Sequence, residues 1–264
     1  MSGSNDVRFR VTPGGQLGGR LRVPGDKSIS HRSIMLGSLA EGRTDVSGFL
    51  EGEDSLATLS AFRAMGVQID GPHDGRVHIE GVGLHGLQQP DGHLYLGNSG
   101  TSMRLMSGLL AGQAFTTTLT GDASLSGRPM QRVTAPLTSM GAHIDATAEG
   151  TAPLLIHGGA TLDGIQYHMP VASAQVKSSL LLAGLYATGQ TCVTEPAPTR
   201  DHTERMLSGM GYPLERDGAR VCIEGGHRLQ GISIDVPADI SSAAFFLVGA
   251  SIAPGSDLTL EHVG

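Results

Sequence analysis

The chain has 264 residues, a formal net charge of −7 and 39% apolar residues. This length allows one large domain or two ordinary ones, and the apolar content is sufficient for a core. The negative charge, the absence of Trp and the 4% aromatic content disfavour a nucleic-acid partner or an anionic membrane. The longest apolar stretch, 180–187, is too short to span a bilayer.

The N-terminus and the two cysteines indicate a compartment. Residues 1–12 lack the apolar segment of a secretory signal, so we expect a cytoplasmic protein. Cys192 and Cys222 lie in strand-like runs without metal-ligand spacing. We therefore expect two buried thiols in a reducing compartment rather than a disulfide or a nucleophile. The sequence has no phosphate-binding Gly-Lys loop, nucleophile elbow or His/Cys cluster, and we expect no metal and no cofactor.

Two kinds of helix alternate along the chain. The segments 33–40, 103–111, 178–187 and 241–253 are apolar on nearly every side, which predicts helices buried in a core. The segments between them carry a single apolar stripe, which predicts helices that cover the outside. Those covering helices are expected at 54–66, 128–141 and 201–211.

An internal repeat organises these elements. The covering helices end in the pairs Met65-Gly66, Met140-Gly141 and Met210-Gly211, at intervals of 75 and 70 residues. Alternating strand-like runs with Gly-led turns follow each pair. A fourth unit opens at 236–246 and is incomplete at Gly264, so we expect a part of a longer protein.

The repeat predicts the domain limits and the fold class. Three units packed round one axis would form one α/β domain over 24–237. Residues 1–23 and 238–264 would belong to a second domain. Val-Pro precedes an Asp at both ends of the repeat, and two interpretations of this stay open. The motif either marks a crossing between domains or is a strand-to-helix turn in which Asp26 and Asp239 are N-caps.

Cations near the starts of the buried helices are the strongest indication of a ligand. A helix N-terminus carries partial positive charge, so Lys and Arg are disfavoured there unless an anion joins them. Lys27, Arg32, Arg104 and Lys177 nevertheless lie at or near the first three buried helices. Parallel helices would point several N-termini at one place, which predicts a site for more than one phosphate or carboxylate.

Other candidate ligands flank these cations. Gly100 would let backbone approach a ligand, and Ser28 adds a hydroxyl beside Lys27. Arg32 has a guanidinium group that can bind phosphate or carboxylate with two hydrogen bonds. Arg128 suits either the first turn of a covering helix or a loop tip, and Arg200, beside Asp201, is free to face a ligand. Neutral groups precede the third buried helix, where a cap is the ordinary role of the serine. These are Ser173 and Gln175. His31 and His202 are interpreted as structural.

Six motifs together resemble the 5-enolpyruvylshikimate-3-phosphate synthase family, from about residue 10 to the end of the chain. They occur in the order and at the spacing of that family. The motifs are VPGDKSISHR (23–32), LGNSGTSMR (96–104), GDASLSGRPM (121–130), PVASAQVKSSLLLAGLYATG (170–189), EPAPTRDHTERML (195–207) and VPADISSAAFF (236–246).

The resemblance implies an inside-out α/β barrel-like domain of three units with pseudo-threefold symmetry, followed by part of a second similar domain. It implies transfer of the enolpyruvyl group of phosphoenolpyruvate to the 5-hydroxyl of shikimate 3-phosphate, in aromatic amino-acid biosynthesis. No metal or covalent intermediate is implied.

The resemblance also implies roles for particular residues. Lys27 would be catalytic and would contact both substrates. The shikimate 3-phosphate side would be formed by Ser28, Arg32, Ser173, Gln175 and Arg200. The phosphoenolpyruvate side, where glyphosate also binds, would be formed by Gly100, Arg128 and Gln175.

The family's acidic base and further cations have no counterpart before Gly264, so we expect the chain to lack activity without the missing C-terminal half. Two alternatives stay open. One is a non-catalytic fragment that binds phosphorylated ligands. The other is a UDP-N-acetylglucosamine enolpyruvyl transferase, whose reactive Cys is absent from the loop containing Ser124 and Ser126.

Overall fold

The structure is a computed structural model that describes residues 9, 10, 12 and 14–264. The chain divides into two compact units. One unit is Gly25–Val236, and the other contains the described residues up to Pro24 together with Pro237–Gly264. No helix in the described part of the chain is both long and apolar enough to cross a membrane.

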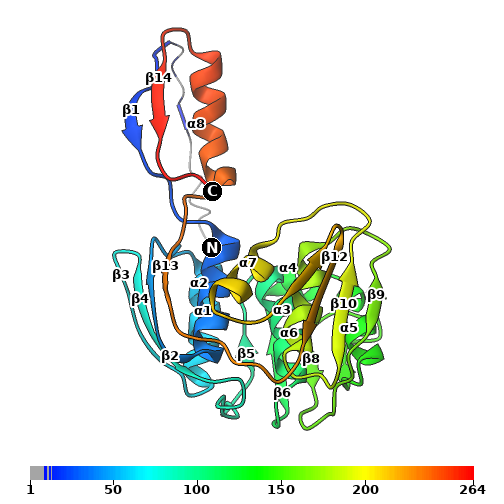
Figure 1. Ribbon diagram of the computed structural model, residues 1–264. Helices are drawn as coiled ribbons and strands as arrows, with labels where there is room; N and C mark the ends of the chain where they lie inside the picture. The colour runs from blue at the N-terminus through cyan, green and yellow to red at the C-terminus, as the bar shows by residue number, and fades with distance from the viewer. Residues whose placement is uncertain (1–8, 11, 13) are drawn as a thin grey trace, which may run out of the picture. The chain divides into compact units, whose positions relative to one another are not determined.

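Three four-stranded sheets with the same strand arrangement make up the larger unit (Figure 1). In each sheet one outer strand is parallel to its neighbour, and the remaining neighbours are antiparallel. The orders are β13-β2-β4-β3, β5-β6-β8-β7 and β9-β10-β12-β11. The strand bounds are β2 Glu41–Ser47, β3 Gln68–His73, β4 Arg76–Val82, β5 Leu94–Tyr95, β6 Thr117–Thr120, β7 Ile144–Asp145, β8 Leu154–Ile156, β9 Gln166–His168, β10 Gln190–Thr194, β11 Glu215–Asp217, β12 Arg220–Glu224 and β13 Ser233–Asp235.

Three buried helices lie inside the larger unit, as the apolar segments predict. They are α1 (Lys27–Leu39), α3 (Gly100–Ala111) and α6 (Ala174–Gly184), and most of their residues are buried. The amphipathic helices α2 (Glu53–Ala64), α5 (Gln131–Ser139) and α7 (His202–Gly209) bury only part of their residues. A short helix, α4 (Ala123–Ser126), precedes α5. The three sheets and these helices share one contiguous apolar core.

The Met-Gly pairs terminate the covering helices. Met65, Met140 and Met210 are the C-cap residues of α2, α5 and α7, and all three are fully buried. The glycines that follow them have φ values of 86°, 101° and 81°. Only glycine adopts this left-handed conformation without a steric cost, so the pair combines a buried anchor with a helix stop.

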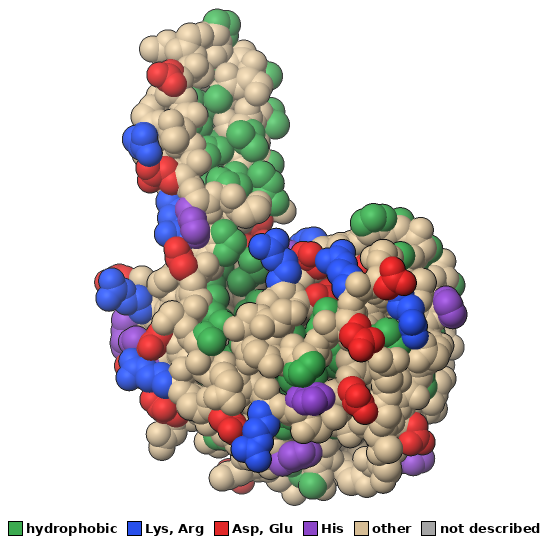
Figure 2. Space-filling view, viewed as in Figure 1, with side chains coloured by type: hydrophobic (Ala, Val, Ile, Leu, Met, Phe, Trp, Pro, Cys, Tyr) green, Lys and Arg blue, Asp and Glu red, His purple; other side chains and the backbone are tan. Residues whose placement is uncertain are grey.

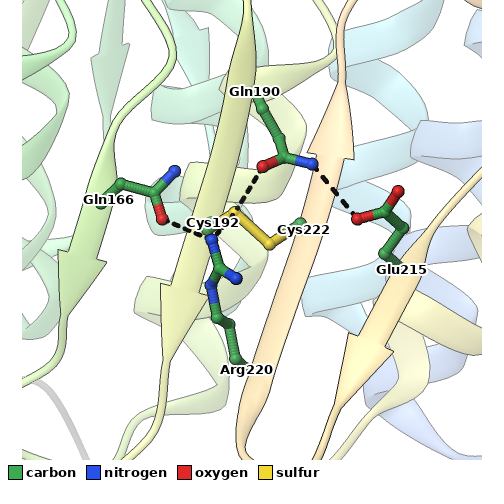
Figure 3. Close-up of a disulfide and its surroundings, with 6 residues drawn as sticks. All are labelled: Gln166, Gln190, Cys192, Glu215, Arg220 and Cys222. Carbon is green, nitrogen blue, oxygen red and sulfur yellow. Dashed lines mark hydrogen bonds between the residues drawn. A yellow bond between two sulfur atoms is a disulfide. The ribbon is translucent and has the colours of Figure 1, made fainter.

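The prediction of two free thiols is wrong. Cys192 on β10 and Cys222 on β12 form a disulfide with an S–S distance of 2.07 Å, although both residues are buried as expected (Figure 3). The two cysteines face each other in the antiparallel register of these strands, with Cα atoms 4.1 Å apart. The sequence does not show this pairing because it depends on strand register across 30 residues. The cytoplasmic location, which depended partly on free thiols, stays a prediction.

The described residues of the smaller unit form two strands and a helix. β1 (Gly18–Leu21) pairs in parallel with β14 (Asp257–Leu260), and α8 (Ile240–Ile252) begins at the N-cap Asp239. Its buried apolar cluster contains Val23, Ala238 and Ala243.

The fourth apolar segment forms the expected helix, α8, but most of its residues are exposed and not buried. Phe245 is 82% exposed and Ile252 is 76% exposed, and hydrophobic side chains gather along the helix in Figure 2. An apolar helix is buried only where other elements cover it, and the smaller unit supplies one pair of strands.

Candidate functional site

The first turns of the three buried helices are built in the same way. Asp26, Ser99 and Ser173 are the N-caps of α1, α3 and α6. Their side-chain oxygens accept hydrogen bonds from backbone N–H groups three residues later, at 2.7, 3.1 and 3.3 Å. Such caps satisfy backbone donors that a helix leaves unpaired. Ser173 therefore has the ordinary capping role that its position predicts.

Arg32 connects three elements from a buried position. Its guanidinium donates to the Ser28 carbonyl at 3.0 Å, to Thr203 Oγ1 at 2.6 Å and to Ser178 Oγ at 2.7 Å. These oxygen atoms come from α1, α7 and α6 and are all uncharged. Arg200, which is exposed, donates to Ser28 Oγ at 3.3 Å. Arg32, Ser28 and Arg200 thus lie together, as the predicted shikimate 3-phosphate side requires.

A second cluster lies at the start of α3. Gln175 on α6 accepts from Arg104 Nη1 at 3.0 Å and donates to Thr101 Oγ1 at 3.0 Å. A Cβ atom at Gly100 would lie 2.8 Å from Arg104 Nη1 and 3.1 Å from Arg128 Nη1. Gly100 therefore faces two guanidinium groups. We call Gly100, Arg104, Arg128 and Gln175 the Gly100 cluster.

Asn98 helps to hold this cluster together. Its side-chain oxygen accepts a hydrogen bond from Arg128, and its side-chain nitrogen donates to Asp122 at 2.7 Å. Asn98 and Thr101 were not predicted as site residues. Their position beside Gly100 in the 96–104 motif was the available signal.

Lys27 is paired with a carboxylate. Its ammonium lies 3.1 Å from Asp54 Oδ2 on α2, and its side chain is 51% exposed. In the structure, the anion beside this cation is therefore a carboxylate of the same unit. An exposed ion pair of this kind contributes about 0–1 kcal/mol, so Asp54 holds the ammonium in place without binding it strongly.

Lys177 is fully enclosed, in contrast with the expectation that it faces a ligand. Its ammonium lies 2.6 Å from Glu195 Oε1 and 2.6 Å from Glu204 Oε1, and all three side chains are at most 4% exposed. Thr199 donates a hydrogen bond to the other Glu195 oxygen. The two glutamates lie 18 and 27 residues after the lysine, so only the packing of α6 against α7 and β10 reveals the pairing.

Burial and like charge shape the titration of the cations. Burial lowers the pKa of Arg32 to about 10, with Glu204 raising it and Arg200 lowering it. Burial, followed by Arg128 and Arg132, lowers the pKa of Arg104. The first effect in each case is desolvation, which penalises the charged form. A bound anion would favour the charged form of both arginines and so oppose this lowering of the pKa.

His202 lies in the same electrostatic environment. Burial lowers its pKa, Arg32 and Arg200 lower it further, and Asp26 and Asp201 raise it. The imidazole is therefore held neutral beside the two arginines.

The structure joins the predicted site residues into two groups, one around Arg32 and one around Gly100, while the side chains of Lys27 and Ser173 bond elsewhere. Hydrogen bonds connect α1 with α6 and α7 through Arg32, and connect α6 with α3 through Gln175. Ser173, by contrast, has its side chain in the cap of α6 and makes no hydrogen bond to Arg200 among the described residues. A depression of about 510 Å³ lies elsewhere, between Glu41, His85 and Arg228, and contains no predicted site residue.

The site has excess cationic donors. Among the described residues, none of Arg32, Arg104, Arg128 and Arg200 forms an ion pair with a carboxylate. Nor do the described side chains include a group of three or more His, Cys, Asp and Glu residues placed to hold a metal ion. Charge-assisted donors without carboxylate partners suit a phosphate or carboxylate ligand.

Comparisons with known proteins agree on one family. Residues 11–264 match the family model described as EPSP synthase (3-phosphoshikimate 1-carboxyvinyltransferase). Proteins named 3-phosphoshikimate 1-carboxyvinyltransferase are 75% identical over 258 residues in Alkalilimnicola ehrlichii and 72% identical over 259 residues in Methylococcus capsulatus. Each alignment covers 98% of this chain, and they cover 58% and 59% of the two relatives.

A solved structure gives the same result. The EPSP synthase from Acinetobacter baumannii is similar with a TM-score of 0.90 and 60% identity. The match covers 96% of this chain and 57% of that one. The chain thus spans a little over half the length of the relatives that it matches.

Proposed function

The chain belongs to the EPSP synthase family, and from this premise we propose that it supplies one half of an active site for enolpyruvyl transfer. The acceptor is the 5-hydroxyl of shikimate 3-phosphate, and the donor is phosphoenolpyruvate. The observation that carries this proposal is the set of four arginines, Arg32, Arg104, Arg128 and Arg200, that have no carboxylate partner in the described part of the chain. Both substrates are polyanions, so such donors match them.

We assign the two anion sites to the two clusters. Ser28, Arg32 and Arg200 bind shikimate 3-phosphate, and the Gly100 cluster binds phosphoenolpyruvate. Gln175, on α6 beside α3, is assigned to both ligands, while Ser173 contributes through the N-terminus of α6. Lys27, held by Asp54, lies at the start of α1 and is the proposed catalytic residue that contacts both substrates.

The chemistry then needs positioning and proton transfer. A proton is added to C3 of phosphoenolpyruvate, and the hydroxyl oxygen attacks C2 as its own proton passes to a base. Loss of a C3 proton and of inorganic phosphate then restores the double bond. The donors on this chain stabilise negative charge on phosphate and carboxylate groups during these steps. No residue of this chain is assigned as the base that accepts the hydroxyl proton.

We also propose a three-unit architecture for the larger unit. The three sheets share one strand arrangement, and each has one buried and one covering helix. An inside-out α/β barrel with pseudo-threefold symmetry accounts for this. The parallel outer strand of the first sheet, β13, comes from the end of the unit and would close the ring. The smaller unit would be part of a second similar domain.

Titration of shikimate 3-phosphate into the 264-residue chain, followed by calorimetry, tests the binding proposal. Arg200→Gln should weaken binding by about 1.5–3 kcal/mol, the value for a charged hydrogen-bonded group. Arg205→Gln is the matched control, because Arg205 is exposed on α7, five residues after Arg200, and belongs to neither cluster. Equal affinities for the wild-type chain and both variants would contradict the assignment.

A phosphate-release assay tests whether this half is sufficient. We expect no turnover from the isolated chain, because the base and the second wall of the site would come from the missing C-terminal half. Turnover on the order of 10 per second, typical of an enzyme, would contradict this expectation. Binding without turnover in the full-length protein would favour the alternative of a non-catalytic module for phosphorylated ligands. The transferase that acts on UDP-N-acetylglucosamine is disfavoured because Ser124 and Ser126 stand where a reactive Cys is expected.

A further inference from the structure

A group of four buried polar side chains lies just behind the proposed site. His31 on α1 places Nδ1 2.8 Å from Thr58 Oγ1, and Nε2 3.3 Å from Ser99 Oγ. Thr58 Oγ1 on α2 lies 2.6 Å from Ser102 Oγ, which donates to Ser99 Oγ at 2.7 Å. These four residues, the imidazole–hydroxyl ring, are at most 2% exposed.

The ring can satisfy every one of its members. With Ser102 donating to Ser99, the Ser99 hydroxyl can donate to Nε2 of His31. The Nδ1–H then donates to Thr58, and Thr58 donates to Ser102. Each side chain gives one hydrogen bond and receives one within the ring, so every member of this buried network has partners. A charged imidazole would place a second N–H against the Ser99 hydroxyl proton and open the ring.

The surroundings of the imidazole favour the neutral form. Burial lowers the pKa of His31 to about 3, Arg32 and Lys27 lower it as well, and Asp54 raises it. The histidine is therefore neutral at physiological pH, although two cations and one carboxylate lie around it.

The ring joins the residues that define the two ends of the proposed site. Ser99 is the N-cap of α3, so its position sets that of Gly100, the next residue. Thr58 lies on α2 four residues after Asp54, whose carboxylate pairs with Lys27. The ring thus connects the first turn of α3 with the second turns of α1 and α2.

We propose that the imidazole–hydroxyl ring positions Gly100 relative to Lys27, so that its members are positioning residues for the anion site at the Gly100 cluster. The ring does not touch a ligand. This inference rests on the proposed function only in naming the ligand, phosphoenolpyruvate. The order of the first turn of α3 can be measured without any ligand.

Two substitutions at one position separate hydrogen bonding from packing. Thr58→Val removes the hydroxyl and keeps the shape, whereas Thr58→Ser keeps the hydroxyl and removes a methyl group. In the 264-residue chain, Thr58→Val should speed amide exchange of residues 100–103 by roughly threefold to tenfold, the effect of one lost hydrogen bond. It should also alter the imidazole ¹⁵N shifts of His31. Thr58→Ser should behave as the wild type.

Ser107→Ala is the matched control. Ser107 is also buried on α3, but its hydroxyl donates to the Met103 carbonyl at 2.7 Å and lies outside the ring. This variant should leave exchange at 100–103 and the His31 shifts unchanged. Equal effects of Thr58→Val and Thr58→Ser, or no effect of Thr58→Val, would overturn the inference.

A ligand titration distinguishes this inference from the proposed function. Addition of phosphoenolpyruvate to the wild-type chain should shift the Gly100 amide resonance, and Thr58→Val should weaken that binding by the same factor. Affinity for shikimate 3-phosphate should change less. If phosphoenolpyruvate leaves the wild-type Gly100 amide unshifted, the ligand assignment fails, while the exchange measurements still decide whether the ring positions the turn.

Discussion

Two sets of cations lie near the starts of the buried helices, and they have opposite surroundings. Lys177 on α6 is enclosed by Glu195 and Glu204. Arg104 and Arg128, beside Gly100, have only neutral hydrogen-bond partners among the described residues. A cation near a helix N-terminus is therefore not by itself a sign of a ligand. The carboxylates that fold against it decide whether it holds the fold together or remains available to an anion.

The largest expected effect is the loss of stability when Lys177 is removed from between Glu195 and Glu204. Lys177→Met would leave two carboxylates buried without a counter-charge, which typically costs about 3–5 kcal/mol. Urea unfolding of the chain at pH 7 measures this loss. As a control, the triple variant Lys177→Met, Glu195→Gln, Glu204→Gln removes all three charges and should recover most of the stability. A single variant as stable as the wild type would show that the ion pairs do not form.

The opposite result is expected for the arginines beside Gly100. Arg128→Gln should weaken phosphoenolpyruvate binding by about 1.5–3 kcal/mol, because it removes a charged donor. Stability should stay the same or rise, since fewer like charges would then face Arg104. Calorimetric titration and urea unfolding of the same sample measure both quantities. A large loss of stability with unchanged binding would show that Arg128, like Lys177, stabilises the fold and does not bind the ligand.

Acid should destabilise the fold through the buried imidazole of His31. The pKa of His31 is lowered from 6.5 to about 3, so between these values the unfolded chain binds more protons than the folded chain. Stability therefore falls as the pH falls through this window, with a slope of up to about 1.4 kcal/mol per pH unit from this group. Urea unfolding at pH 7, 6 and 5 measures the slope, and His31→Asn should reduce it. An equal slope in both proteins would rule out His31 as the source.

The smallest expected effect on folding is at Gly100. In Gly100→Ala the added methyl group would meet the ends of the Arg104 and Arg128 side chains, which can move aside. Stability should therefore change by less than about 1 kcal/mol. Binding of phosphoenolpyruvate and of glyphosate should weaken, because the methyl group occupies the space that both would use. Unchanged titrations of both ligands would show that they bind away from Gly100.

The sequence predicts local features better than pairings between distant residues. The buried helices α1, α3 and α6 followed from the apolar pattern, since each depends on residues close in sequence. The partners of Arg32 could not be predicted, because Thr203 and Ser178 lie 171 and 146 residues away. The predictions for Lys177 and for Cys192 were wrong for the same reason. Both depend on how α6, α7, β10 and β12 pack.

Because apolar side chains of α8 are exposed, the stability of the smaller unit depends on what covers them. A two-stranded sheet with one helix buries too little apolar surface to be stable alone, and among the described residues its core cluster has three buried side chains, Val23, Ala238 and Ala243. Anything that covers Phe245 and Ile252 when the unit is folded, and not when it is unfolded, would stabilise it by mass action. The melting of this unit should therefore depend on the concentration of whatever covers it, whereas the larger unit, with its own core, should melt independently of concentration.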